Sequence, residues 1–492
     1  MNAPPLSPPA TVTEKDRVSI VIGVLTCMLL AALDQTIVAP AIPAMGAALG
    51  GSDYLTWIVS AYFLTSTATT PLYGKIADIR GRRPTLYTAL AIFVAGSVIC
   101  ALAPEMWVLI LGRAVQGVGG GGLMALAQIV ISDLVPPKER GRFAVLISGT
   151  WAIASIAGPI VGGVLTEHLS WTVIFWLNIP LALVAAVMTW ETLKRVPWER
   201  RSHKLDVLGS VLVVTATASL MLALAFGPQA RFGWTSPVVL ALFAGAALLT
   251  PLITWHLTRA REPLVPVEVL GNRIVLAATS SVFFSMASSI GLTVTVPLYF
   301  ELILHMTASQ AGLGLLGFTM GSVIGAAYAG RAMVYVDDYK RLPTIGLLVA
   351  AAGLAWLALR ADLAGFIEAE IVLILIGVGL GPQFPTTTVA VQNAVEPHNV
   401  GIATGVSSFL RALGAAVGVA VIGAVAAAAG ISVSEGLHTS PAGLQGLTGA
   451  AFRPVFLALS AFVSAGLVLL AIMPAKPLRR TNAPQGVSSA RQ

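Results

Sequence analysis

The strongest constraint on this chain is its repeated alternation between long apolar runs and short basic clusters. Fourteen segments contain at most one ionisable residue each, and each is near or above the roughly 17–25 residues that a helix needs to cross a bilayer. Because lipid cannot satisfy free backbone N–H and C=O groups, these runs predict transmembrane helices. The segments are residues 18–43, 54–74, 84–104, 106–132, 143–166, 169–190, 207–230, 232–258, 274–300, 302–330, 342–359, 371–395, 399–434 and 454–475.

Composition supports an integral membrane protein. Mean hydropathy is +0.86, and 10% of the residues are charged, against roughly 25% in soluble domains. The two cysteines, Cys27 and Cys100, lie inside apolar runs and offer neither a disulfide framework nor a metal cluster. The net charge of +7 comes from short clusters between the runs, so membrane topology explains it better than nucleic-acid binding.

The placement of basic residues predicts the orientation. With the N-terminus taken as cytoplasmic, 24 of the 29 Lys and Arg residues fall on the cytoplasmic side, and two, Arg113 and Arg411, lie inside spans. Membrane proteins concentrate Lys and Arg in their cytoplasmic loops. Both termini are therefore expected in the cytoplasm.

The two halves of the chain repeat with a shift of 260 residues. Eight residues of the first half find the same residue type in the second half. They are Gly117, Gly119, Gly121, Val135, Pro137, Gly141, Gly158 and Gly163, which match Gly377, Gly379, Gly381, Val395, Pro397, Gly401, Gly418 and Gly423. Repeated halves are typical of transporters, whose substrate site lies near the bilayer midplane between them.

The repeat predicts two six-helix bundles that flank an extra pair of helices. The expected segments are a cytoplasmic N-terminal tail (1–17), the first bundle (18–193), a basic cytoplasmic linker (194–206), the extra pair (207–258), a second cytoplasmic linker (259–273), the second bundle (274–475) and a cytoplasmic C-terminal tail (476–492).

Two ionisable residues interrupt spans of the first half. Asp34 lies about two-thirds of the way along the first span, and Arg113 lies in the fourth. An intramembrane Arg costs ~2.5–3.5 kcal/mol on insertion scales and needs a partner or water. A carboxyl group in low dielectric favours its neutral form until a cation or water stabilises the anion, so Asp34 could exchange a proton for a cationic substrate. The alternatives are a structural Asp34, satisfied by Arg113 or a helix backbone, and a snorkelling or structurally paired Arg113.

The loop after the second span reads GKIADIRGRRP and begins at Gly74. Gly74 and Gly81 suit a tight turn, and Asp78 stands among four basic residues. A plain positive-inside anchor would explain the bases. In the alternative, Asp78 lies near a helix N-terminus, where the macrodipole favours an anion, and pairs with Arg82 and Arg83 to latch two helices together.

Glycines mark the fourth and fifth spans. LGRAVQGVGGGG in the fourth span satisfies G-x-G-x-x-G from Gly117 on, but no strand precedes it, so a dinucleotide site is rejected. GTWAIASIAGPIVGG in the fifth span contains Pro159, which removes a backbone hydrogen bond. Beside it, Gly158, Gly162 and Gly163 let a neighbouring helix approach closely, and packing alone could explain them.

Together these motifs resemble the major facilitator superfamily. GKIADIRGRRP matches the signature loop between helices 2 and 3 of that family almost completely, and LDQTIVAPAIP resembles the first-helix motif of its fourteen-helix drug:proton antiporters, with Ala39 where Asn is usual. Arg113, Gln116 and Gly117 match the helix-4 motif that is associated with proton transfer. Residues 149–163 are similar to the helix-5 motif of proton-driven exporters.

The resemblance implies an all-α integral membrane protein with the major facilitator fold: two six-helix bundles plus two extra helices, fourteen transmembrane helices in all. It implies a proton-coupled antiporter that exports lipophilic or cationic drugs and toxic compounds across the bacterial cytoplasmic membrane by alternating access. The expected partners are amphipathic or cationic small molecules, protons, membrane lipids and, in a Gram-negative host, a periplasmic adaptor. No catalysis, cofactor, metal or nucleic acid is expected. An exporter dedicated to an endogenous metabolite or lipid and a non-transporting sensor or scaffold stay open.

The resemblance also implies roles for individual residues. Asp34 would carry the proton and compete for substrate, and Arg113 would modulate or relay that proton. The loop that contains Asp78 would gate the cytoplasmic side, and the fifth-span motif would shape a helix interface. Glu301, where the family commonly has Gln, is a second coupling candidate if it faces the cavity and a solvated residue if it lies at the outer interface. Trp57 and Tyr62 are candidates for lining the cavity.

Overall fold

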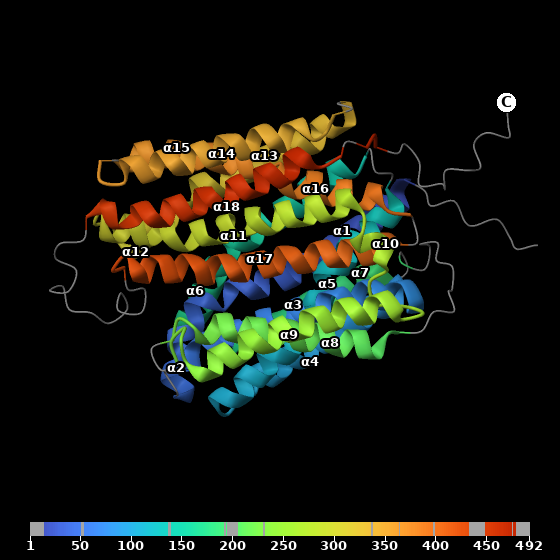
Figure 1. Cartoon of the computed structure of the whole chain (residues 1–492). Coiled ribbons are helices and arrows are strands. Elements are labelled where there is room, and N and C mark those ends of the chain that lie inside the picture. The colour runs from blue at the N-terminus through green and yellow to red at the C-terminus, as the bar shows by residue number, and fades with distance from the viewer. Residues whose placement is uncertain are drawn as a thin grey trace, which may run out of the picture. The chain divides into compact units, whose positions relative to one another are not determined.

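The computed structural model describes residues 14–50, 54–135, 139–190, 193, 205–229, 232–335, 338–363, 365–396, 399–431, 448–474 and 476–478. All regular secondary structure in these ranges is helical (Figure 1). Thirteen helices there are long and apolar enough to cross a membrane, and α3 (Leu55–Arg80), rich in Thr and Ser, has the length of a fourteenth. The predicted all-α membrane fold is confirmed. The predicted tails and the linker 194–206 lie largely outside the described residues.

The chain forms two compact units. The first unit comprises residues 1–135 and 153–205, and the second comprises residues 136–152 and 206–492. Helix α6 (Arg140–His168) contributes to both units, and the extra helix pair belongs to the second.

In the first unit, α5 is the central helix and contacts α1, α3 and α4, while α7 packs on α1 and α4. Pro40 ends the first helix of this unit before the membrane span is complete, because proline cannot donate a backbone hydrogen bond and is tolerated in the first turn of a new helix. The helices of this unit, besides α3 and part of α6, are α1 (Glu14–Ile37), the 3-10 turn η1 (Ala39–Ala41), α2 (Ile42–Leu49), α4 (Arg82–Ala101), α5 (Met106–Leu134) and α7 (Val173–Trp190).

In the second unit, α11 runs between α17 and α18 and contacts both (Figure 1). The predicted twelfth span consists of two helices, α15 and α16, because Gly381 and Pro382 separate them. The helices are α8 (Val207–Phe226), α9 (Pro237–Arg259), α10 (Val267–Leu270), α11 (Arg273–Leu302), α12 (Ala308–Leu313), α13 (Leu315–Tyr335), α14 (Arg341–Arg360), α15 (Phe366–Leu380), α16 (Gln383–Ala394), α17 (Val400–Ala428), η5 (Gly449–Phe452) and α18 (Arg453–Ile472).

The repeated glycines make equivalent contacts in each unit. A Cβ atom added at Gly117 or Gly121 would strike the backbone of α3, and one at Gly119 would strike α4. In the second unit, a Cβ at Gly377 or Gly381 would strike α13, and one at Gly379 would strike α14. The helix triplets α3–α4–α5 and α13–α14–α15 are therefore packed in the same way, through backbone contacts that only glycine permits.

One carboxylate holds the extra pair, α8 and α9, together at one end. Asp206 caps α8 by accepting from the backbone N–H of Gly209 at 2.8 Å, and it accepts from the N–H of Leu264 at 3.1 Å. His256 Nε2 on α9 lies 2.8 Å from the same carboxylate. Burial raises the pKa of Asp206, but these hydrogen bonds outweigh burial and lower it.

Candidate functional site

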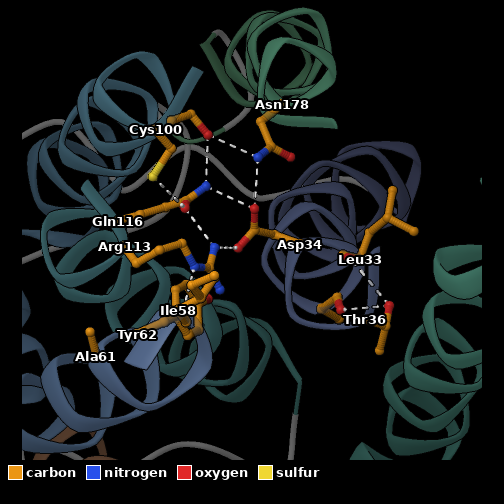
Figure 2. Close-up of polar contacts among 12 residues, drawn as sticks. Leu33, Asp34, Thr36, Ile58, Ala61, Tyr62, Cys100, Arg113, Gln116 and Asn178 are labelled. Atoms are coloured by element: carbon orange, nitrogen blue, oxygen red, sulfur yellow. Dashed lines mark hydrogen bonds and ion pairs between the residues drawn. The ribbon is translucent and has the colours of Figure 1, made fainter. Parts of the chain in front are cut away.

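Asp34 on α1 and Arg113 on α5 form a buried ion pair in the first unit. Arg113 Nη1 lies 2.6 Å from Asp34 Oδ2 (Figure 2), and the exposed fractions of the two side chains are 2% for Arg113 and 0% for Asp34. Arg113 also donates to Gln116 Oε1 at 2.6 Å and, through Nε, to the carbonyl of Ile58 at 3.0 Å. Its guanidinium carbon lies 4.5 Å from the centroid of the Tyr62 ring. The intramembrane Arg thus has a carboxylate, two further oxygen acceptors and an aromatic ring as partners.

Two side-chain amides complete the shell of Asp34. Its Oδ1 accepts from Gln116 Nε2 and from Asn178 Nδ2, each at 2.8 Å, so Figure 2 shows the carboxylate held between α5 and α7. Both amides also donate to Ser97 Oγ on α4, at 2.7 and 2.8 Å. All three groups that contact the carboxylate donate to it. A carboxyl group that only accepts hydrogen bonds is in its ionised form.

This arrangement ties four helices to one ionised group. Helices α4, α5 and α7 each contribute a polar side chain, and α1 contributes the carboxylate. A proton on Asp34 would remove the charge that pairs with Arg113 and would direct a hydroxyl at a neighbouring donor. In this conformation Asp34 meets no solvent and is paired with Arg113, as the structural alternative describes.

The fifth-span motif packs against the same stretch of α1. Thr36 Oγ1 donates to the Ala154 carbonyl at 2.7 Å, and a Cβ at Gly158 would strike that hydroxyl. A Cβ at Gly162 would strike the carbonyl of Ile37. The glycines thus allow α6 to approach α1 within three residues of Asp34. The other two motif residues differ: Gly163 faces open space, and Pro159 is exposed within a continuous helix.

The signature loop forms a three-residue bridge in the first unit. Arg82 Nη1 pairs with Asp78 at the end of α3, and Arg82 Nε lies 2.7 Å from Asp133 Oδ2 at the end of α5. Gly81 joins α3 to α4 with φ of +94°, a conformation that disfavours side chains. Asp78 therefore pairs with Arg82 as predicted for a latch, and the latch joins three helices rather than two. The predicted place of Asp78 near a helix N-terminus is wrong, because it lies in the last turn of α3. Gly74 is buried within α3.

Arg83, the second arginine of that loop, was predicted to pair with Asp78, but it contacts aromatic rings and forms no ion pair with any acid of the described residues. Its guanidinium carbon lies 4.6 Å from the ring of Trp190 and 5.9 Å from the ring of Tyr87. These contacts join the start of α4 to the end of α7.

Two predicted residues, Glu301 and Trp57, lie apart from the charge network, and a third, Tyr62, packs against it. Glu301 belongs to the second unit, where it is half-buried in the last turn of α11 and makes no hydrogen bond or ion pair within the described ranges. Trp57 packs against a hydrophobic cluster of the first unit. Tyr62 is fully buried against Arg113 and lines no open space in this conformation.

Sequence reasoning missed Ser97, Asn178 and Asp133. Ser97 and Asn178 carry no charge, so they did not interrupt the apolar spans. The one signal that could have indicated Asp133 is its place at the end of a span, close to the basic residues of the next loop.

The comparisons with known proteins identify the family. The family model described as Major Facilitator Superfamily matches residues 24–419 and 278–489. The chain belongs to the major facilitator superfamily. Among its relatives, the "Multidrug transporter protein MdtP" of Bacillus subtilis (strain 168) is 32% identical over 413 residues, which cover 84% of this chain and 76% of the relative. "Multidrug resistance protein 3" of the same organism is 30% identical and covers 82% and 79%.

The relatives extend to eukaryotes, and solved structures share the fold. The "MFS-type efflux pump MMF1" of Pseudozyma antarctica is 33% identical over 79% of this chain and 73% of its own. The crystal structure of the human organic anion transporter MFSD10 matches with a TM-score of 0.64 and 17% identity, covering 92% of this chain and 99% of that one. The proton:xylose symporter XylE matches with a TM-score of 0.62 and 16% identity, covering 94% and 98%. This protein is a multi-pass membrane transporter of the superfamily with multidrug-efflux relatives.

Proposed function

We propose that this protein is a proton-coupled antiporter that exports lipophilic or cationic compounds by alternating access. The observation that carries the proposal is the buried pair of Asp34 and Arg113, the place in the first unit where ionised groups face each other inside apolar spans. Intramembrane charges are costly and mark ion or substrate paths. The multidrug-efflux relatives support the direction and the substrate class. The proposed location is the bacterial cytoplasmic membrane, with both termini in the cytoplasm.

The proposed cycle alternates between a paired and a protonated Asp34. In the paired state, the carboxylate holds α1 against α5. When Asp34 takes up a proton, Arg113 keeps the Gln116 and Ile58 oxygens and the face of Tyr62 as partners. Arg113 is thus stabilised while α1 is released.

The release of α1 would reach α6 directly. Thr36 is hydrogen-bonded to Ala154 of α6, and Gly158 and Gly162 hold the two helices in contact. A cationic substrate that reaches the protonated acid would favour loss of the proton, because the anion gains a counter-charge. Proton and cation then compete for one group, which is the requirement for antiport.

The test is efflux of a cationic dye from inverted vesicles under an imposed pH gradient. Asp34→Asn should abolish gradient-driven transport and leave dye exchange without a gradient measurable. Asp362→Asn is the matched control, because Asp362 also pairs with an arginine, Arg453 at 2.6 Å, but lies at an exposed helix end of the second unit. Undiminished gradient-driven transport by Asp34→Asn removes this residue from the mechanism.

The same assay separates the other functions that the sequence leaves open. An exporter dedicated to one endogenous metabolite or lipid would transport none of a panel of dyes. It would transport its own compound with the same dependence on Asp34. A sensor or scaffold would show no flux in wild type. A periplasmic adaptor is a further predicted partner, which a pull-down from a Gram-negative host would test.

A further inference from the structure

The second unit carries an intramembrane cation that the proposed cycle does not use. Arg411 lies 11 residues after Val400, the first residue of α17, which is roughly 16 Å along the helix at 1.5 Å per residue. Its guanidinium carbon lies 4.5 Å from the ring of Phe384 on α16. Its Nη2 donates to Ser408 Oγ, one turn earlier on the same helix, at 3.3 Å.

Arg411 lacks the counter-charge that Arg113 has. Within the described ranges no carboxylate forms an ion pair with Arg411, and one hydroxyl serves its five N–H donors. The shift of 260 residues places Leu373 and Ile376 where the first unit has Arg113 and Gln116, and both are buried apolar residues. The repeat therefore supplies no second polar cluster to neutralise Arg411.

Arg411 points into the bundle of the second unit rather than toward lipid. Gly414 and Gly418 share its helix face, at spacings of three and seven residues. A Cβ at Gly414 would strike the backbone of Phe283, and one at Gly418 would strike that of Ala287, both on α11. The guanidinium lies against α16. Arg411 is nevertheless partly exposed, so part of its side chain is not covered by the second unit's own helices.

We propose that Arg411 binds an acidic group of the substrate, such as the carboxylate or sulfonate of an amphipathic compound. The planar guanidinium fork matches such a group in a bidentate geometry, and the Phe384 ring beside it offers an apolar contact. Arg411 lies about two-fifths of the way along α17, which agrees with the midplane position of transporter sites. This inference rests on the proposed transport function and extends its substrates to zwitterions and acids.

The experiment compares two dyes that differ by one charge. A xanthene dye with a free carboxylate and its methyl ester are titrated against the purified full chain in lipid nanodiscs without a gradient, and binding is read by fluorescence anisotropy. Arg411→Gln should weaken binding of the acid by about tenfold or more and leave binding of the ester within about twofold. Arg411→Lys, which keeps the charge without the fork, should fall between wild type and Arg411→Gln. Arg259→Gln is the matched control, because Arg259 also stacks on an aromatic ring, that of Trp255 at 5.0 Å, at the end of α9.

Each outcome decides the inference. Equal losses for both dyes, no loss for either, or no measurable binding of the acid to wild type would overturn it. If Arg411→Gln does not assemble, the ratio of acid to ester affinity in Arg411→Lys decides, and an unchanged ratio refutes the inference. If Arg411→Gln selectively loses binding of the acid but wild type shows no proton-driven efflux, the proposed function alone is refuted. If Arg411→Gln selectively loses binding of the acid and wild type shows proton-driven efflux, both proposals are supported.

Discussion

The pair of Asp34 and Arg113 predicts an unusual order of stability among three variants. Asp34→Asn leaves a buried guanidinium that faces an amide, and Arg113→Gln leaves a buried carboxylate with two amide donors but no cation. Removing one partner of a buried ion pair costs about 3–5 kcal/mol, because the other charge stays buried and unpaired. The double variant removes both charges and keeps Gln116 and Asn178 as hydrogen-bond partners. It should therefore be more stable than either single variant.

The chain contains its own reporters for this measurement. Cys27 and Cys100 are free and buried in the first unit, so a thiol-reactive fluorophore reports thermal unfolding without an engineered cysteine. At about 2–4 °C per kcal/mol, each single variant should lower Tm by roughly 6–20 °C. The double variant should recover most of that loss, which gives a large coupling in the double-mutant cycle. The reasoning would be refuted if the single variants had the Tm of wild type. It would also be refuted if the double variant lost as much Tm as the two single variants together.

Three further predictions concern packing, the signature loop and pH. Gly158→Ala should lower the free energy of unfolding by about 1–3 kcal/mol, because its methyl group strikes α1. Gly163→Ala is the control: its methyl group meets open space, so its Tm in the thiol assay should equal that of wild type. Arg82→Lys should lower Tm despite its retained charge, because an ammonium cannot bridge two carboxylates as the guanidinium fork does; an unchanged Tm would show that the bridge is not needed. Asp206 has a lowered pKa in the fold, so its stabilisation is present at neutral pH and is lost as the pH falls below about 4. Wild type should then lose more Tm between pH 5 and pH 3 than Asp206→Asn, and parallel curves would contradict this.

The fold could be predicted because each transmembrane run must satisfy its backbone within one helix. Long apolar stretches sufficed for the helical spans, and the shift of 260 residues matched the glycines of α5 with those of α15, although the triplets that they pack were not predicted. The exact ends of the helices could not be predicted as well. The first helix ends at Ile37, and the same span continues as a second, short helix to Leu49. Pro40 interrupts the helix between them without ending the membrane crossing.

The charge network could be predicted only in part. Intramembrane ionisable residues are conspicuous, so Asp34 and Arg113 were found, and their mutual pairing was one of the alternatives. Asn178 and Ser97 were not found, because an uncharged polar residue barely lowers the hydropathy of its span. The rotational position of each residue on its helix, which only packing determines, decides whether Asn178 reaches Asp34 and whether Ser97 reaches the amides that bind Asp34.

Glycine contacts leave α5 with a single position against its neighbours. Gly117, Gly119 and Gly121 meet backbone atoms of α3 and α4, and a slide of one residue would bring Val118 into such a contact. In the proposed cycle the three helices would therefore move together as one rigid group. Helix α1 is joined to that group by the pair of Asp34 and Arg113 and to α6 by Thr36, Gly158 and Gly162, and it would be the element that a proton releases in that cycle.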